Sequence, residues 1–273
     1  MKGRKLFWVA FIPFLLAGCL GGGVIPPPPP VGEDTDWTVM IFLNGDNDLH
    51  NDAWQDFNSL EKVGSTDRVR VVVQFDSPWG GAARYLVKKD ALPNLITSPV
   101  LQYLGEVNMG DASELADFVR FCATNYPARK YALIIWDHGT GFKSKDISFD
   151  FSPEGAITIP ELGTALSLST MYLGKKIDFL GMDACLMAMV EIAYEVKDHA
   201  RVLVTSQELV PGEGWDYETI LRALVSHPLM GERDLARIVV DSYIDYYRWG
   251  SFTQSAIDLK EIFSLGRVVD ELA

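Results

Sequence analysis

Short apolar runs that alternate with helix-patterned segments constrain the fold of this 273-residue chain more than any other feature. The five strongest runs are nearly continuous stretches of Val, Ile, Leu and Phe, which is typical of strands covered on both sides. They lie at residues 38–43, 69–75, 130–136, 177–180 and 202–205. Strands that alternate with helices form a parallel sheet wrapped on both faces. We therefore predict an α/β fold with a mostly parallel central sheet and helices on both faces.

The segments between these runs predict the remaining elements. Helices are expected at residues 53–63, 111–125, 159–168, 187–196, 217–225 and 233–247, and shorter strands at 83–87, 100–104 and 254–257. Residues 143–154 are polar and irregular, and we expect them to form an exposed flap. Sites in such folds lie beyond the carboxyl ends of the strands, so the side chains that follow the runs are the functional candidates.

The first 36 residues differ in composition from the rest. Residues 1–18 combine a basic head with an apolar run that is too short to span a bilayer, which is typical of a secretory signal peptide. The Leu-Ala-Gly-Cys sequence that ends at Cys19 resembles the lipobox of bacterial lipoproteins. This resemblance implies that Cys19 carries the lipid anchor of the mature protein. The alternative is an ordinary signal peptide followed by an incidental cysteine.

Residues 19–36 contain three consecutive glycines and five consecutive prolines, a composition typical of a tether. The residue after Cys19 is Leu20 rather than the Asp associated with inner-membrane retention, so we expect an exported protein anchored at the outer membrane or cell surface. One folded domain is expected over residues 37–273. Residues 268–273 form a helical pattern without a capping signal, and a truncation at this end is one interpretation.

The chain is acidic, with a formal net charge of −13 at pH 7. This charge disfavours nucleic acid as a partner and favours cationic substrates, although a surface charged only for solubility has the same composition. Cys122 lies among apolar residues of a helical pattern, which favours a buried thiol over a disulfide with Cys185. No group of residues has metal-ligand spacing, so the sequence predicts no metal site.

Two residues with the chemistry of a base and a nucleophile, His138 and Cys185, follow predicted strand ends. Cysteine catalysis needs a thiolate, a positioned base and hydrogen-bond donors for the oxyanion. The N–H groups of Gly139 and Cys185 are candidate oxyanion donors. A helix beginning near Leu186 would also bring its positive end to the sulfur. A single His and a single Cys occur together in many unreactive proteins, so spacing alone leaves catalysis open.

Five motifs occur along the chain in a fixed order. They are Asn-Gly-Asp-Asn-Asp-Leu at residues 44–49, Gly-Glu-Val-Asn-Met-Gly at 105–110, Trp-Asp-His-Gly-Thr-Gly at 136–141, Met-Asp-Ala-Cys-Leu-Met-Ala-Met-Val-Glu at 182–191 and Ser-Gln-Glu-Leu-Val-Pro-Gly-Glu-Gly-Trp-Asp-Tyr at 206–217. Together they resemble the signature segments of the clostripain family of cysteine endopeptidases, which is related to gingipains and legumains. The resemblance implies a caspase-like three-layer sandwich in which His138 and Cys185 form the catalytic dyad.

Asp183 lies two residues before Cys185, so both side chains share one face of an extended segment. Its carboxylate can then pair with a cationic substrate side chain. The resemblance implies the same, because clostripain-like enzymes cleave after Arg or Lys. The alternative is a carboxylate that only caps a turn. Glu208 and Glu213 are candidates for a second acidic wall and Trp215 for the pocket lining, with solvent-facing carboxylates and a core tryptophan as alternatives.

The resemblance also raises calcium and self-cleavage. The family's archetype is described as calcium-dependent, and Asp46, Asp48 and Asp52 begin like an EF-hand loop. The glycine and glutamate positions of such a loop hold Asn and Phe here, so we reject an EF-hand and leave another calcium site open. No cofactor is required by the sequence. Family members are often activated by cleavage between the histidine and cysteine strands, which makes Lys143 and Lys145 candidates for autoprocessing.

The sequence therefore predicts an exported cysteine endopeptidase that cleaves after Arg or Lys through an acyl-enzyme on Cys185. Its expected partners are protein or peptide substrates with basic residues and, through Cys19, a membrane. The alternative is a catalytically inactive surface lipoprotein that uses the acidic cleft as a binding module.

Overall fold

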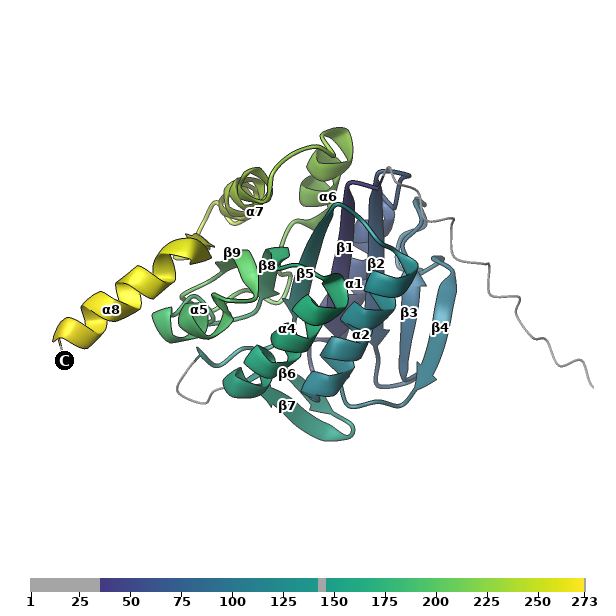
Figure 1. The fold of residues 1–273 in the computed structure, drawn as a ribbon. Coiled ribbons are helices and arrows are strands. Elements are labelled where there is room, and N and C mark those ends of the chain that lie inside the picture. Colours follow the sequence, from purple (N-terminus) through teal and green to yellow (C-terminus); the bar gives the residue numbers. More distant parts are fainter. Residues whose placement is uncertain (1–34, 142–145, 273) are drawn as a thin grey trace, which may run out of the picture.

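The computed structural model describes residues 35–141 and 146–272, and within them eight strands form one central sheet (Figure 1). Its parallel strands are β1 (Trp37–Asn44), β2 (Val69–Asp76), β5 (Lys130–Trp136), β8 (Ile177–Asp183) and β9 (Ala200–Thr205). The antiparallel strands are β3 (Ala82–Leu86), β4 (Val100–Gly105) and β10 (Ser255–Asp258). The strand order is β10-β9-β8-β5-β1-β2-β3-β4. The prediction of a mostly parallel sheet is confirmed.

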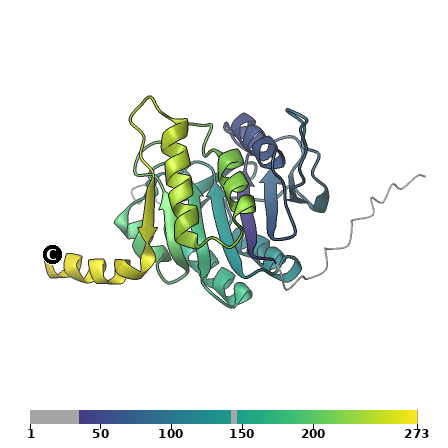
Figure 2. The ribbon, with the colours of Figure 1, turned by 90° about the horizontal axis from the view of Figure 1, so that it is seen from above.

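Helices cover both faces of this sheet and complete a three-layer sandwich (Figure 2). The helices on one face are α2 (Ala112–Asn125), α4 (Ile159–Leu173) and α5 (Val190–Val196). Those on the other face are α1 (His50–Glu61), α6 (Tyr217–Ser226) and α7 (Glu232–Tyr246). A short helix, η1 (Leu259–Glu261), leads from β10 into α8 (Ile262–Leu272), which extends away from the body of the domain.

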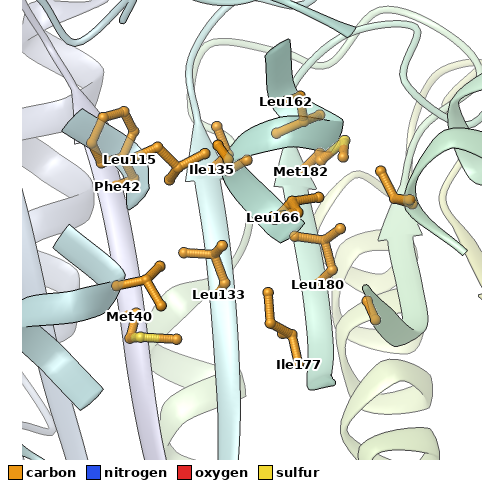
Figure 3. Close-up of a cluster of buried hydrophobic side chains, with 14 of the residues drawn as sticks. Met40, Phe42, Leu115, Leu133, Ile135, Leu162, Leu166, Ile177, Leu180 and Met182 are labelled. Atoms are coloured by element: carbon orange, nitrogen blue, oxygen red, sulfur yellow. The ribbon is translucent and has the colours of Figure 1, made fainter. Parts of the chain in front are cut away.

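The central strands are apolar throughout because successive side chains point to opposite faces and both faces are covered. On β1, Met40 and Phe42 belong to the core beneath α2 and α4, where Figure 3 shows Phe42 beside Leu115 of α2. Val39 and Ile41, the alternate residues of the same strand, belong to the core beneath α1, α6 and α7. Two cores therefore hold the sheet between the helical layers.

Side-chain caps define where the helices of the first face begin. The Asp111 carboxylate accepts a hydrogen bond from the Ser113 N–H at 2.8 Å and caps α2. Thr158 and Glu161 form a capping box at α4, whose first turn also contains proline, as the sequence indicated. These local signals support the helix starts that the hydrophobic pattern predicts.

The prediction of an exposed flap at residues 143–154 is wrong for residues 146–150, which are buried or half-buried, whereas residues 151–154 are exposed. Two strands, β6 (Asp146–Phe151) and β7 (Glu154–Thr158), form a separate antiparallel pair there. Ile147 and Ile157 are fully buried in the core beneath α2 and α4. Ser148 and Asp150 of β6 are buried as well. A strand is recognised by apolar residues at its buried positions, and these two buried residues are polar, so the sequence pattern does not reveal β6.

The described chain begins inside the folded domain. Thr35 and Asp36, which the sequence analysis assigns to the tether, are buried, and Asp36 pairs with Arg68 at 2.6 Å. The predicted signal peptide, most of the tether and Cys19 lie outside the described residues. Within the described residues, no helix has both the length and the apolar composition that crossing a membrane requires.

Carboxylates collect at the carboxyl edge of the sheet, and Asp76 at the end of β2 is fully buried. Its Oδ1 accepts a hydrogen bond from the Ser77 N–H at 2.8 Å, whereas its Oδ2 has no partner among the described residues. Burial raises the pKa of Asp76 to about 8, and the charges of Asp150 and Glu106 add to this effect. The unfolded chain loses this proton near the ordinary pKa of 3.8. Stability should therefore fall as the pH rises from about 4 to about 8.

We predict that Asp76→Asn stabilises the protein at alkaline pH, because the amide keeps the acceptor for Ser77 and removes the buried ionisation. The melting temperature should rise by at least about 3 °C at pH values near 8 and change much less near pH 4. Thermal unfolding monitored by circular dichroism at the two pH values measures this. A shift of equal size at both would contradict the assignment.

Candidate active site

The candidate catalytic residues follow two strands that end side by side at the carboxyl edge of the sheet. In the parallel pairing of β5 with β8, Trp136 lies opposite Asp183. His138 and Cys185 each stand two residues beyond this pair, so adjacent strands deliver them to equivalent positions. Both line one cavity of about 200 Å³. The structure thus brings the predicted base and the predicted nucleophile to the same cavity.

Gly139 brings the loop after β5 into contact with the loop after β8. A Cβ atom on Gly139 would lie 2.5 Å from the carbonyl oxygen of Cys185, a distance that no side chain tolerates. Only glycine therefore permits this approach. Among the described residues, neither the Gly139 N–H nor the Cys185 N–H donates a hydrogen bond. An oxyanion requires such donors, and these two belong to Cys185 itself and to the residue after His138.

The imidazole of His138 forms a hydrogen bond with Asp48, which the sequence suggested only as a calcium ligand. Nε2 of His138 lies 2.8 Å from Oδ1 of Asp48, in the loop that follows β1. This hydrogen bond stabilises the carboxylate and lowers the pKa of Asp48. It also leaves Nδ1 as the ring nitrogen available to Cys185. The role of Asp48 follows from the adjacency of β1 and β5, and the sequence does not reveal that adjacency.

Asp137 is buried, and its carboxylate binds the loop after β1. Its carboxylate accepts hydrogen bonds from Asn44 Nδ2 at 3.0 Å and Asn47 Nδ2 at 2.8 Å. Burial raises the pKa of Asp137 well above the usual range, although the backbone N–H of His138 and the side-chain amide of Asn47 oppose the shift. Because Asn47 directly precedes Asp48, this network fixes the loop that reaches His138.

The helix predicted to begin near Leu186 begins four residues later, at Val190. Leu186 has a positive φ of 62°, and its N–H donates to the carbonyl of Glu208 at 3.2 Å. The segment after Cys185 therefore runs alongside the loop that follows β9. The donor beside the sulfur is the N–H of Val210, at 3.2 Å, in place of a helix N-terminus. It can stabilise negative charge on the half-buried sulfur.

Asp183 lies at the floor of the cavity and is 3% exposed. Its Oδ2 accepts hydrogen bonds from the Trp215 N–H and the Tyr217 hydroxyl, both at 2.9 Å. Its Oδ1 is buried without a partner among the described residues. Burial raises the pKa of Asp183 to about 7, and the two donors oppose this shift. One carboxylate oxygen is therefore available to a ligand in the cavity.

The three other predicted pocket residues lie elsewhere. Glu208 is exposed, and it is its backbone that binds the segment after Cys185. Glu213 is exposed and lines a neighbouring depression of about 600 Å³. Trp215 borders the same depression, but its side chain is 2% exposed and packs edge-on against Phe179 of the core. None of the three lines the cavity of Cys185.

The carboxylates considered for calcium do not converge. Asp48 binds His138, Asp52 lies beside Gly212, and the charge of His50 acts on Asp46. No three His, Cys, Asp or Glu side chains within residues 35–141 and 146–272 are grouped to hold a metal ion. Lys143 and Lys145 lie outside the described residues.

The fold resembles solved structures of C11 cysteine proteases. A secreted C11 cysteine protease from Bacteroides thetaiotaomicron, in complex with an irreversible peptide inhibitor, has a TM-score of 0.72 and 24% identity, over 85% of this chain and 68% of its own. An inactive zymogen C11 protease from Parabacteroides distasonis has a TM-score of 0.69 and 22% identity, over 86% and 65%. These likenesses confirm the caspase-like α/β sandwich.

Sequence comparisons identify the family. Clostripain of Hathewaya histolytica is 33% identical over 136 residues, which are 42% of this chain and 24% of that protein. The chain thus matches about a quarter of the length of this relative. The model of the clostripain family matches residues 41–273, which include His138 and Cys185. The resemblance indicated by the motifs is confirmed, and the chain belongs to the clostripain family of cysteine peptidases, a class of hydrolases.

Proposed function

We propose that this protein is a cysteine endopeptidase in which His138 and Cys185 form the catalytic dyad. The observation that carries the proposal is their delivery to one cavity by adjacent strands, with two free N–H donors beside them. His138 removes the proton from the thiol, and the sulfur attacks the carbonyl carbon of the substrate peptide bond. The N–H groups of Gly139 and Cys185 stabilise the oxyanion.

The remaining steps also use groups of this chain and water alone. Protonated His138 donates its proton to the leaving amine as the tetrahedral intermediate collapses to a thioester on Cys185. Water, deprotonated by the same histidine, then hydrolyses the thioester and frees the thiol. Asp48 stabilises the imidazolium that forms in each half of the cycle and orients the ring through Nε2.

We propose that the cavity selects Arg or Lys on the amino side of the cleaved bond. Asp183 at its floor has one buried oxygen without a partner among the described residues, and burying an unpaired carboxylate is costly. A cationic side chain that reaches this oxygen relieves that cost. A neutral side chain leaves it in place, so the arrangement discriminates by charge.

Export and self-processing of this protein are two separate proposals. A solved relative is described as secreted and another as an inactive zymogen. We propose that residues 1–18 direct export, that Cys19 carries the lipid anchor, and that cleavage after Lys143 or Lys145 activates the enzyme. Mass spectrometry of the purified protein tests the last point, and an intact chain with full activity would contradict it.

The first prediction from this proposal concerns peptidase activity. The purified protein should hydrolyse a fluorogenic peptide that ends in Arg, and Cys185→Ala should lose at least about 1,000-fold in kcat because the nucleophile is gone. Cys122→Ala is the matched control, since Cys122 is fully buried on α2 and away from the site. Absence of turnover in the parent protein would instead support the binding-module alternative.

The second prediction concerns Asp48. Asp48→Ala should lower kcat by about 10-fold to 100-fold with little change in KM, because the imidazolium loses its charged partner while substrate contacts remain. Asp67→Asn, which removes an exposed carboxylate before β2, should behave as the parent enzyme. Unchanged kcat in the Asp48 variant would show that the ion pair has no part in turnover.

The third prediction concerns specificity. Asp183→Asn should lower kcat/KM for Arg and Lys substrates by about 100-fold, since the variant lacks the charge that offsets the desolvated cation. The rate at which neutral iodoacetamide alkylates Cys185 should stay within about 3-fold of the parent if the dyad itself is intact. Retention of the Arg preference would refute this assignment.

A further inference from the structure

A second buried carboxylate lies close to Asp183 on a different element, and it lines the neighbouring depression rather than the cavity of Cys185. Asp56 belongs to α1 and is 6% exposed. A Cβ atom on Gly214 would lie 2.6 Å from Oδ2 of Asp183 and 3.2 Å from Oδ2 of Asp56. The two oxygens are therefore less than about 6 Å apart, which is close enough for strong coupling of their charges.

Each carboxyl group has one oxygen that is satisfied and one that is not. Oδ2 of Asp56 accepts a hydrogen bond from the indole N–H of Trp136 at 2.7 Å. Trp136 lines the cavity of Cys185, so Asp56 braces a wall of that cavity. Oδ1 of Asp56 accepts no hydrogen bond from the described residues, and the same holds for Oδ1 of Asp183. Each acid thus retains an acceptor, Asp183 in the lining of the cavity and Asp56 in the lining of the neighbouring depression.

The groups around this pair are acidic or neutral. Asp52 on α1 and Glu213 on the loop before α6 add negative charge beside Asp56. The hydroxyls of Tyr217, Tyr243 and Tyr247 lie near Asp183. Burial is the main cause of their raised pKa values, and the charge of Asp183 raises these values further. Within the described residues no Lys or Arg forms an ion pair with either acid. Lys62, which borders the neighbouring depression, pairs with Glu218 at 3.1 Å.

Two buried acids at this separation cannot both ionise without a cation. Burial is the main cause of the raised pKa of Asp56, and the charge of Asp183 adds to it. The pKa of Asp183 is about 7. The two groups titrate as one coupled unit, and the pair retains at least one proton at neutral pH while the cavity is empty.

We propose that Asp56 and Asp183 act as one coupled acid pair, and that the cationic side chain that pairs with Asp183 in the cavity displaces the proton that the pair holds. The proton leaves a carboxyl group for the solvent, and the resulting carboxylate pairs with the guanidinium or ammonium group. This inference rests on the proposed preference for Arg or Lys and adds Asp56 as a specificity-determining residue. Substrate affinity becomes coupled to pH through this pair, separately from the dyad.

Proton release on binding of a cation measures this directly. Benzamidine carries the amidinium group of an arginine mimic, and the Cys185→Ala protein binds without turnover. Isothermal titration calorimetry at pH values near 7, in two buffers with different enthalpies of ionisation, counts the protons released. We expect the release of a substantial fraction of one proton near pH 7 and a smaller fraction near pH 9.

The same measurement on Cys185→Ala/Asp56→Asn separates charge from structure, because the amide oxygen keeps the hydrogen bond from Trp136. Proton release near pH 7 should fall by at least half, and affinity near pH 9 should fall by about 10-fold. Cys185→Ala/Glu218→Gln removes a carboxylate from the neighbouring depression and should match the parent in both. Melting curves establish that each variant is folded.

The outcomes distinguish this inference from the proposed function. Benzamidine binding without proton release, or an Asp56→Asn variant identical to the parent, would overturn the inference while cleavage after Arg still stands. If Asp56→Asn does not fold, absence of proton release from the parent near pH 7 overturns it equally. Failure of benzamidine to bind would refute cation selection, whereas peptide cleavage by the enzyme with Cys185 intact reports on the peptidase activity.

Discussion

The parallel pairing of β5 with β8 is the constraint on which the site depends. Parallel strands advance together, so the register that sets Trp136 opposite Asp183 also sets His138 level with Cys185. A shift of one residue would turn every side chain of a strand to the opposite face. The two cores prevent such a shift, because each strand buries apolar residues on both of its faces. The geometry of the proposed dyad is in this sense a consequence of core packing.

Carboxylates at the two edges of the sheet have different kinds of partner. At the amino edge, Asp36 pairs with Arg68, and Asp178 pairs with Lys175 and Arg201. At the carboxyl edge, the acids at the strand ends are held by neutral donors: Asp76 by Ser77, Asp137 by Asn44 and Asn47, and Asp183 by Trp215 and Tyr217. Neutral donors satisfy oxygen atoms without cancelling charge. Burial therefore raises the pKa values of these acids, and a cation that enters the carboxyl edge favours their ionised form.

Most of the sheet could be predicted from the sequence. A strand that is covered on both faces consists almost entirely of apolar residues, so each central strand appears in the sequence as a continuous apolar run. His138 and Cys185 could be found for the same reason, as polar residues that interrupt the pattern where such runs end. The β6–β7 pair could not, since the buried Ser148 and Asp150 make β6 look polar. The start of α5 was misplaced because the segment after Cys185 forms its hydrogen bonds with the loop after β9. Such contacts have no local signal.

The same limit explains why Asp48 and Asp56 escaped sequence reasoning, since each acts across a contact between strands or layers. The strand order supplies these contacts. β5 is flanked by β1, whose loop brings Asp48 to His138, and β8 is flanked by β9, whose loop brings the Val210 N–H to Cys185. Each member of the dyad is thus oriented by the outer neighbour of its own strand. The site consequently needs four consecutive strands in the order β9-β8-β5-β1, and the two motifs that carry the chemistry can act only within that sheet.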